Sequence, residues 1–282
     1  MRLHAENGCL TLDGGTMDYI RFGSGERILV ILPGVGDGFR TVKGTALPFA
    51  LGYRKLARDF TVYMFSRREP LPEHCSTREM AADLGRALDR LGLGQICLLG
   101  VSQGGMIAQW VAIDQPKRVD RLVLTVTAAR PNETMREVLE NWMALGQRGE
   151  YRAIMEDSAL RSYSAKTAER QRRLAGLVSA LTKPKDFSRF LIQAESCLGH
   201  DAWEELPRIF CPTLVIGGSE DGIVTAEGSR ELARRIVGAE LFLYEGLSHG
   251  LYEEAKDFLD RVRDFCLQGG EKGSTFQENL VY

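Results

Sequence analysis

The sequence predicts an α/β protein: a doubly wound, mostly parallel sheet with an inserted helical cap. Six short segments are apolar on both faces, as expected of parallel strands that are covered by helices. Helix-like segments lie between most of them, and this alternation is typical of a doubly wound sheet. The six predicted strands are residues 28–32, 61–65, 96–99, 122–126, 213–216 and 241–244.

Local signals place the helices and the edge of the sheet. Ser76 and Glu79 have the spacing of a capping box, which predicts a helix that runs to about residue 91 and stops at Gly92. The pair of segments around Asp13-Gly14-Gly15 indicates an antiparallel hairpin on one edge. The predicted hairpin strands are 10–12 and 17–22, and further core helices are predicted at 227–237 and 253–267.

One segment interrupts the alternation. Residues 130–203 contain no strand pattern and predict helices at 135–145, 151–160, 168–181 and 187–197. Residues 130–205 carry 12 Lys/Arg and 12 Asp/Glu, so this insertion offers no net charge to a nucleic acid or a membrane. The predicted division is a core of 1–129 and 206–268, a helical cap of 130–205 and a disordered tail of 269–282.

Composition limits the classes of function. A chain of 282 residues with a net charge of −2 fits one large α/β domain and has no basic field for nucleic acids or anionic membranes. No apolar run reaches the roughly 18 residues of a membrane span, and the N-terminus lacks the apolar region of a signal peptide. Six cysteines without a C-x-x-C pair indicate free thiols, so we expect a cytoplasmic protein without a metal site.

The most informative motif is Gly100-Val101-Ser102-Gln103-Gly104. It lies between a predicted strand and an amphipathic segment, at 106–112, that reads as a helix. This is the setting of a nucleophile elbow, a turn so tight that the serine hydroxyl stands clear of the backbone. Side chains two positions before and after the serine would collide there, so both positions require glycine. Ser102 is therefore the predicted nucleophile.

A serine nucleophile needs a base, and the chain has four histidines: His4, His74, His200 and His249. His4 lies on the N-terminal edge, His74 in a loop just before a helix cap, and His200 in the helical insertion. His249 follows the last predicted strand, and active-site residues collect at the carboxyl ends of strands in open α/β proteins. Elimination and position together favour it as the general base.

The base needs a carboxylate that fixes its tautomer. Asp221 follows the predicted strand 213–216 at the same end of the sheet, and Glu220 is the adjacent alternative. The loop after 122–126 holds Thr127-Ala128-Ala129 and no carboxylate. The resulting chain order is nucleophile, acid, histidine.

An acyl-transfer site also needs donors for the oxyanion. One is the N–H of Gln103, after the nucleophile, and the second is expected from the loop 33–39, where we assign the N–H of Val35. The same loop has a rival interpretation as a phosphate cradle. It reads G-x-G-x-G instead of G-x-G-x-x-G, and no helix pattern starts immediately after it, so dinucleotide binding is disfavoured.

At this point the chain resembles the α/β-hydrolase superfamily. Gly34-Val35, 100–104, 219–224 and Ser248-His249-Gly250 match its motifs in type, order and spacing over roughly residues 8 to 268. Pro33 stands where many members carry histidine. The resemblance is closest to the branch with enol-lactonases, carboxylesterases and C–C bond hydrolases, and a serine nucleophile disfavours a haloalkane dehalogenase or epoxide hydrolase.

These observations predict a serine hydrolase that cleaves a small ester, lactone or thioester without a cofactor, with a small acyl compound as its partner. One alternative keeps the triad for C–C bond hydrolysis or perhydrolysis, and another is a ligand-binding or receptor protein with vestigial hydrolysis. Oligomeric state stays open. Candidate pocket residues in the cap, of which we expect two or three to touch substrate, are Trp142, Met143, Phe187, Phe190, Leu191 and Trp203.

Overall fold

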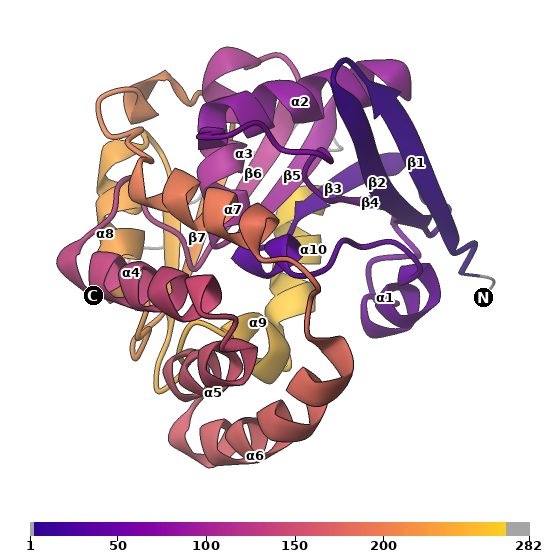
Figure 1. Ribbon diagram of the computed structural model, residues 1–282. Coiled ribbons are helices and arrows are strands. Elements are labelled where there is room, and N and C mark those ends of the chain that lie inside the picture. The colour runs from indigo at the N-terminus through magenta and orange to yellow at the C-terminus, as the bar shows by residue number, and fades with distance from the viewer. Residues whose placement is uncertain (1–2, 269–282) are drawn as a thin grey trace.

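The computed structural model describes residues 3–268, and the predicted disordered tail lies outside this range. An eight-stranded sheet forms its centre, in the order β1-β2-β4-β3-β5-β6-β7-β8 (Figure 1). β1 and β2 are antiparallel, β2 and β4 are antiparallel, and every other neighbouring pair is parallel. The strands are β1 (Glu6–Leu12), β2 (Gly15–Phe22), β3 (Arg27–Leu32), β4 (Phe60–Phe65), β5 (Ile96–Val101), β6 (Val119–Thr125), β7 (Thr213–Gly218) and β8 (Glu240–Tyr244).

This sheet confirms the predicted fold class. Each of the six apolar segments is a parallel strand, and β4, β5 and β7 are buried at every position, as their continuous apolar character requires. The N-terminal hairpin is β1 and β2, paired in register from Glu6–Arg21 to Leu12–Gly15.

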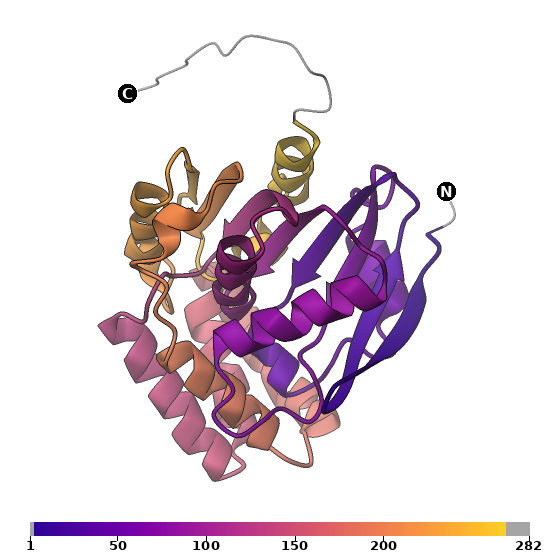
Figure 2. The same ribbon diagram turned by 90° about the horizontal axis from the view of Figure 1, so that it is seen from above.

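Helices cover both faces of the sheet (Figures 1 and 2). Leu84, Ile107 and Leu232, from α2, α3 and α8, belong to one apolar cluster, and Ala50 and Val262, from α1 and α10, belong to the cluster on the opposite face. The core helices are α1 (Ala46–Gly52), α2 (Thr77–Arg90), α3 (Gln103–Asp114), α8 (Thr225–Arg235), α9 (Leu251–Glu254) and α10 (Phe258–Leu267), with the 3-10 helices η1 (Val35–Gly38) and η2 (Leu206–Arg208).

Local chemistry explains how two of these helices begin and end. The capping box of α2 is present: Ser76 Oγ accepts from Glu79 N–H, and Ser76 N–H donates to Glu79 Oε2 at 2.8 Å. The prediction of a single helix at 253–267 is wrong. The backbone becomes extended at Ala255 (ψ 115°), and this break separates α9 from α10. Asp257 lies at this break and accepts a hydrogen bond from Tyr244 Oη.

Between β6 and β7 the chain forms four α-helices, followed by the 3-10 helix η2, and no strand. They are α4 (Glu133–Gln147), α5 (Tyr151–Ser162), α6 (Ala165–Thr182) and α7 (Ser188–Leu198). Helices α4 and α7 share a third apolar cluster that also reaches Phe39, beside η1. α5 and α6 pack on each other and lie farthest from the sheet (Figure 1). No helix among residues 3–268 is both long enough and apolar enough to cross a membrane.

Candidate active site

Ser102 lies at the turn between β5 and α3 with φ 54° and ψ −120°, a backbone conformation that residues other than glycine rarely adopt. The flanking glycines are required by contact. A Cβ on Gly100 would lie 2.5 Å from the carbonyl oxygen of Gly104, and one on Gly104 would lie 2.1 Å from the carbonyl oxygen of Leu32. A third glycine was not singled out by the motif: a Cβ on Gly105 would lie 2.5 Å from Thr127. The sequence therefore folds locally into the turn that the motif predicts.

Hydrogen bonds from the neighbouring strand hold this strained turn. Ser102 N–H donates to the carbonyl of Thr125 at 2.9 Å, and the carbonyl of Ser102 accepts from Thr127 Oγ1 at 2.7 Å. Thr127 carries no sequence signal of its own, because its role depends on where β6 ends relative to β5.

The structure brings Ser102, His249 and Asp221 into one hydrogen-bonded chain. His249 Nε2 lies 3.0 Å from Ser102 Oγ, and His249 Nδ1 lies 2.9 Å from Asp221 Oδ2. Both His249 and Asp221 are 7% exposed. The alternative acid, Glu220, is exposed, and the hydrogen bonds of His249 Nδ1 go to Asp221 instead. This arrangement allows the imidazole to accept the serine proton while the carboxylate holds its other nitrogen as the donor.

The Asp221 carboxylate is stabilised as an anion. Burial on its own would raise its pKa, but the charge and hydrogen bond of His249, with the N–H groups of Ile223 and Val224, together lower it. Those two N–H groups donate to Asp221 Oδ1 at 2.9 and 3.0 Å. Asp221 therefore stays ionised and acceptor-only, as an orienting group must.

The two residues predicted to donate to the oxyanion line the same cavity. Val35 is the first residue of η1 and Gln103 the first of α3, so neither N–H has an acceptor within its own helix. Both line a cavity with Ser102. Gly34 brings the loop against the nucleophile, since a Cβ there would lie 3.2 Å from Ser102 Cβ. At Pro33, where the resemblance leads one to expect histidine, the carbonyl accepts from Arg67 Nη2 at 2.6 Å.

A cavity of about 170 Å³ opens over Ser102 and His249. Its walls come from the oxyanion loop, from the strand ends and from α4, α5 and α7 of the insertion. The lining residues are Gly34, Val35, Gly36, Ser102, Gln103, Met106, Met135, Leu139, Trp142, Ser158, Ser162, Cys197, Ile223, Val224, His249 and Tyr252.

Of the six candidate pocket residues, Trp142 alone lines this cavity. Met143, Phe187, Phe190 and Leu191 pack in the apolar cluster between α4, α7 and the oxyanion loop. Trp203 lies elsewhere, in contact with the guanidinium groups of Arg130 and Arg235. The residues of α4 and α5 that line the cavity, besides Trp142, are Met135, Leu139, Ser158 and Ser162. Which side of each helix faces the cavity depends on how the helix is rotated about its axis, and the sequence does not determine this rotation.

The remaining histidines within the described range lie away from this site. His74 is exposed and pairs with Glu195 at 2.8 Å, and His200 is buried against Thr77. His4, near the start of β1, has positive φ (46°). Among residues 3–268 no three His, Cys, Asp or Glu side chains gather in a way that could hold a metal ion.

The family model described as "alpha/beta hydrolase fold" matches residues 27–256, which include the elbow, the acid and the histidine. The chain belongs to the alpha/beta hydrolase fold family. Like its relatives in this family, it is a hydrolase.

Curated relatives of this hydrolase are distant. It is 25% identical over 183 residues to 3-oxoadipate enol-lactonase 2 of Acinetobacter baylyi, covering 64% of this chain and 67% of that protein. It is 29% identical over 176 residues to RutD of a Caulobacter species, provisionally named a carbamate hydrolase. This match covers 61% of this chain and 65% of that protein. The chain thus spans about two thirds of the length of these relatives. Mouse serine hydrolase BPHL is 25% identical over 275 residues, which cover 92% of this chain and 85% of that protein.

Solved structures agree on the fold over nearly the whole hydrolase. MGS-M2, an alpha/beta hydrolase enzyme from a deep-sea metagenome library, superposes with a TM-score of 0.83 at 20% identity, covering 96% of this chain and all of that one. The enol-lactonase of Burkholderia xenovorans has a TM-score of 0.77 at 22% identity, with 92% and 99% covered. At these identities the likeness concerns the fold.

Proposed function

We propose that this hydrolase cleaves a small carboxylic ester, lactone or thioester through an acyl-enzyme on Ser102. The observation that supports this best is the 3.0 Å contact between Ser102 Oγ and His249 Nε2, with Asp221 behind the imidazole. A hydroxyl that can pass its proton to a buried, oriented base is an activated nucleophile.

In the proposed reaction, Ser102 Oγ attacks the carbonyl carbon as His249 Nε2 takes its proton. The N–H groups of Val35 and Gln103 stabilise the oxyanion of the tetrahedral intermediate. His249 then returns the proton to the departing alcohol or thiol, which leaves the acyl group on Ser102. A water molecule then attacks the acyl-enzyme in the same way, with His249 as its base, and the carboxylic acid product is released as Ser102 regains its proton.

The cavity supports a small acyl group. Its volume of about 170 Å³ lies below the range of about 300–1,000 Å³ for drug-sized ligands, and Met135, Leu139 and Trp142 give it apolar walls. In this proposal, residues 130–205 act as a cap that encloses the acyl group. Two relatives carry the names enol-lactonase and, provisionally, carbamate hydrolase. Lactones and carbamates are both cleaved at a carbonyl carbon, in keeping with this choice over C–C cleavage or perhydrolysis. A cytoplasmic location is part of the proposal, supported by six free cysteines.

Labelling with a fluorophosphonate and assays on p-nitrophenyl acetate test the proposal. Ser102→Ala should lose labelling and about 10⁶ in kcat. Asp221→Asn should lose about 10⁴, because an amide favours the wrong tautomer of His249, whereas the exposed neighbour variant Glu220→Gln should retain activity. Retention of more than a few per cent of activity in folded Ser102→Ala would show that the serine is not the nucleophile.

A further inference from the structure

Helix α7 of the insertion packs directly on the loop that carries one oxyanion donor. Gly38 ends η1, and a Cβ there would lie 2.6 Å from the Cα of Phe190, so only glycine permits this approach. The ring of Phe190 stacks on Phe39 with centroids 4.2 Å apart. The backbone that begins at Val35 therefore rests against α7.

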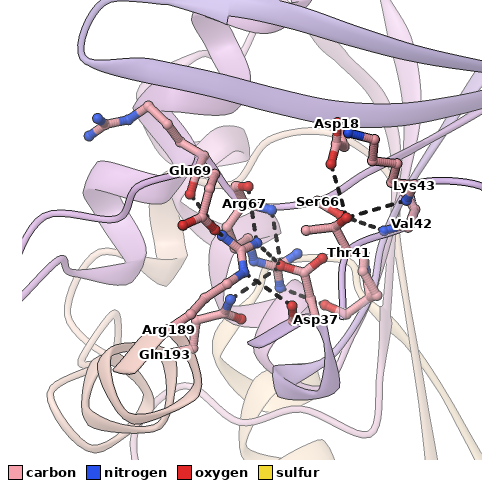
Figure 3. A network of polar contacts seen from close by, with 12 residues as sticks. Asp18, Asp37, Thr41, Val42, Lys43, Ser66, Arg67, Glu69, Arg189 and Gln193 are labelled. Atoms are coloured by element: carbon pink, nitrogen blue, oxygen red, sulfur yellow. Dashed lines mark hydrogen bonds and ion pairs between the residues drawn. The ribbon is translucent and has the colours of Figure 1, made fainter. Parts of the chain in front are cut away.

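Arg189 of α7 joins this loop to the end of β4 (Figure 3). Its Nη2 lies 2.5 Å from Asp37 Oδ2, and its Nε donates to the Asp37 carbonyl at 3.2 Å. The same guanidinium donates to the carbonyls of Arg67 and Arg68 and to Glu69 Oε2. Each of its three nitrogens is thus used, and Lys could not reproduce this geometry.

Asp37 collects these contacts at the centre of η1. Its side chain is 1% exposed, and Oδ2 accepts from Arg67 N–H at 3.1 Å and from Gln193 Nε2 at 3.2 Å, besides Arg189. Two of these three donors belong to α7. By contrast, the far end of the same loop is held by the core alone, since Val42 N–H donates to Ser66 Oγ at 2.8 Å (Figure 3).

The second oxyanion donor is also tied to α7. The Gln103 side chain is buried, and its Nε2 donates to the carbonyl of Gln193 at 2.8 Å and to Ser196 Oγ at 3.0 Å. Its Oε1 accepts from Arg67 Nη2 at 3.0 Å. Helix α7 therefore contacts the Gln103 side chain and the loop that carries Val35, which together supply the two N–H groups of the proposed oxyanion hole.

We propose that α7 sets the geometry of the oxyanion hole, with Arg189 as a positioning residue that acts through Asp37 on the N–H of Val35. This inference rests on the proposed function. It gives the insertion a part in the chemistry besides specificity, because a shift of α7 relative to the sheet would displace the two donors from Ser102. Hydrogen-bond donors stabilise a transition state only when they are held in place beforehand.

The kinetic test compares Arg189→Met with wild type on p-nitrophenyl acetate. We expect kcat to fall about 10- to 100-fold, less than the 10²–10³ of removing a donor outright, with KM changed by less than about threefold. The pH at which activity is half-maximal should not move, because Ser102, His249 and Asp221 are untouched. Arg189→Lys should recover part of kcat. Arg172→Met is the matched control, since Arg172 pairs with Glu169 on the exposed side of α6, and it should behave as wild type.

A second variant and a second measurement cover loss of folding. Arg189→Gln keeps a neutral hydrogen-bonding side chain beside Asp37, whose charge is still opposed by the buried Arg67, so it should fold where Arg189→Met does not and should still lose kcat. Hydrogen exchange, which needs no activity, should accelerate in residues 33–41 of the Arg189 variants and not in Arg172→Met.

Wild-type kcat and unchanged exchange in the loop, in either folded Arg189 variant, would overturn the role of α7. Loss of kcat with a shifted pH profile would overturn it also, because the triad would then be the affected part. If wild type reacts with neither ester nor fluorophosphonate, the proposed function fails, and loop exchange alone then decides whether α7 holds the loop.

Discussion

At the scale of single residues, His200 shows how a buried polar group fixes its own protonation state. Nδ1 lies 2.9 Å from Thr77 Oγ1, whose oxygen accepts from Trp110 Nε1 at 3.1 Å. Nε2 lies 3.4 Å from Gln109 Oε1, while Gln109 Nε2 donates to the carbonyl of Ala128. The amide oxygen can only accept, so Nε2 carries a hydrogen. Burial lowers the pKa of the ring to about 3, so Nδ1 carries none and accepts from Thr77. The ring is therefore neutral.

This arrangement predicts a pH-dependent stability. Burial lowers the pKa of His200 to about 3, while an unfolded histidine has a pKa of about 6.5. Between these values the unfolded chain binds the extra proton, so this residue's contribution is present above pH 6.5 and is lost as the pH falls, by up to about 1.4 kcal/mol per pH unit.

His200→Gln should reduce that loss, so urea unfolding at pH 7, 6, 5 and 4 should give a smaller fall in the free energy of unfolding than in wild type. His74→Gln is the control. Its exposed ring bonds Glu195, which raises its pKa and gives a pH effect of the opposite sign. Equal slopes for wild type and His200→Gln would contradict the assignment of a neutral, buried ring.

Residues of the triad were predictable, and the residues that join α7 to the oxyanion loop were not. Ser102, Asp221 and His249 each follow a strand, so chain order and the end of the sheet select them. Arg189 and Asp37 lie 152 positions apart, and neither carries a local motif. Only the packing of α7 on η1 makes them partners.

At the scale of elements, the strands were predictable because burial on both faces leaves a continuous apolar run. The cap helices were predictable as helices, but their inward faces were not. Leu139 and Leu145 lie on the same helix, and only Leu139 lines the cavity. That difference depends on how α4 is rotated against the core, which is a property of tertiary packing.

These two leucines provide a matched test of the acyl pocket. Leu139→Ala should enlarge the cavity and shift preference toward longer acyl chains by about 10- to 100-fold, since methylene-scale changes alter transition-state binding by about 1–3 kcal/mol. Leu145→Ala, buried on α4 outside the cavity, should leave the preference order unchanged. Values of kcat/KM across p-nitrophenyl esters from acetate to octanoate measure both. The same shift in both variants would indicate a general loosening of the cap.

At the scale of the whole molecule, stability is distributed unevenly. Strand β5 is buried at every position. Helix α6 instead turns small residues inward, with Ala168, Ala175 and Ser179 as its buried positions. Its large apolar side chains face outward: Leu177 and Leu181 are 66% and 81% exposed. The sequence pattern predicts a helix here, but the usual rule that large apolar residues face the core fails for it.

Because a helix with so little buried apolar surface gains little from packing, α6 should open separately from the rest of the molecule. We expect the backbone amides of α6 to exchange at least about 100-fold faster than those of β5 and α3 in hydrogen-exchange mass spectrometry. Helix α4 is the control within the same insertion, since Met135, Val138 and Leu139 bury its inner face. Protection of α6 equal to that of α4 at micromolar protein would contradict the expectation. Protection that disappears on dilution would identify a second copy of the chain as the cover for the exposed leucines, because only an intermolecular contact depends on concentration.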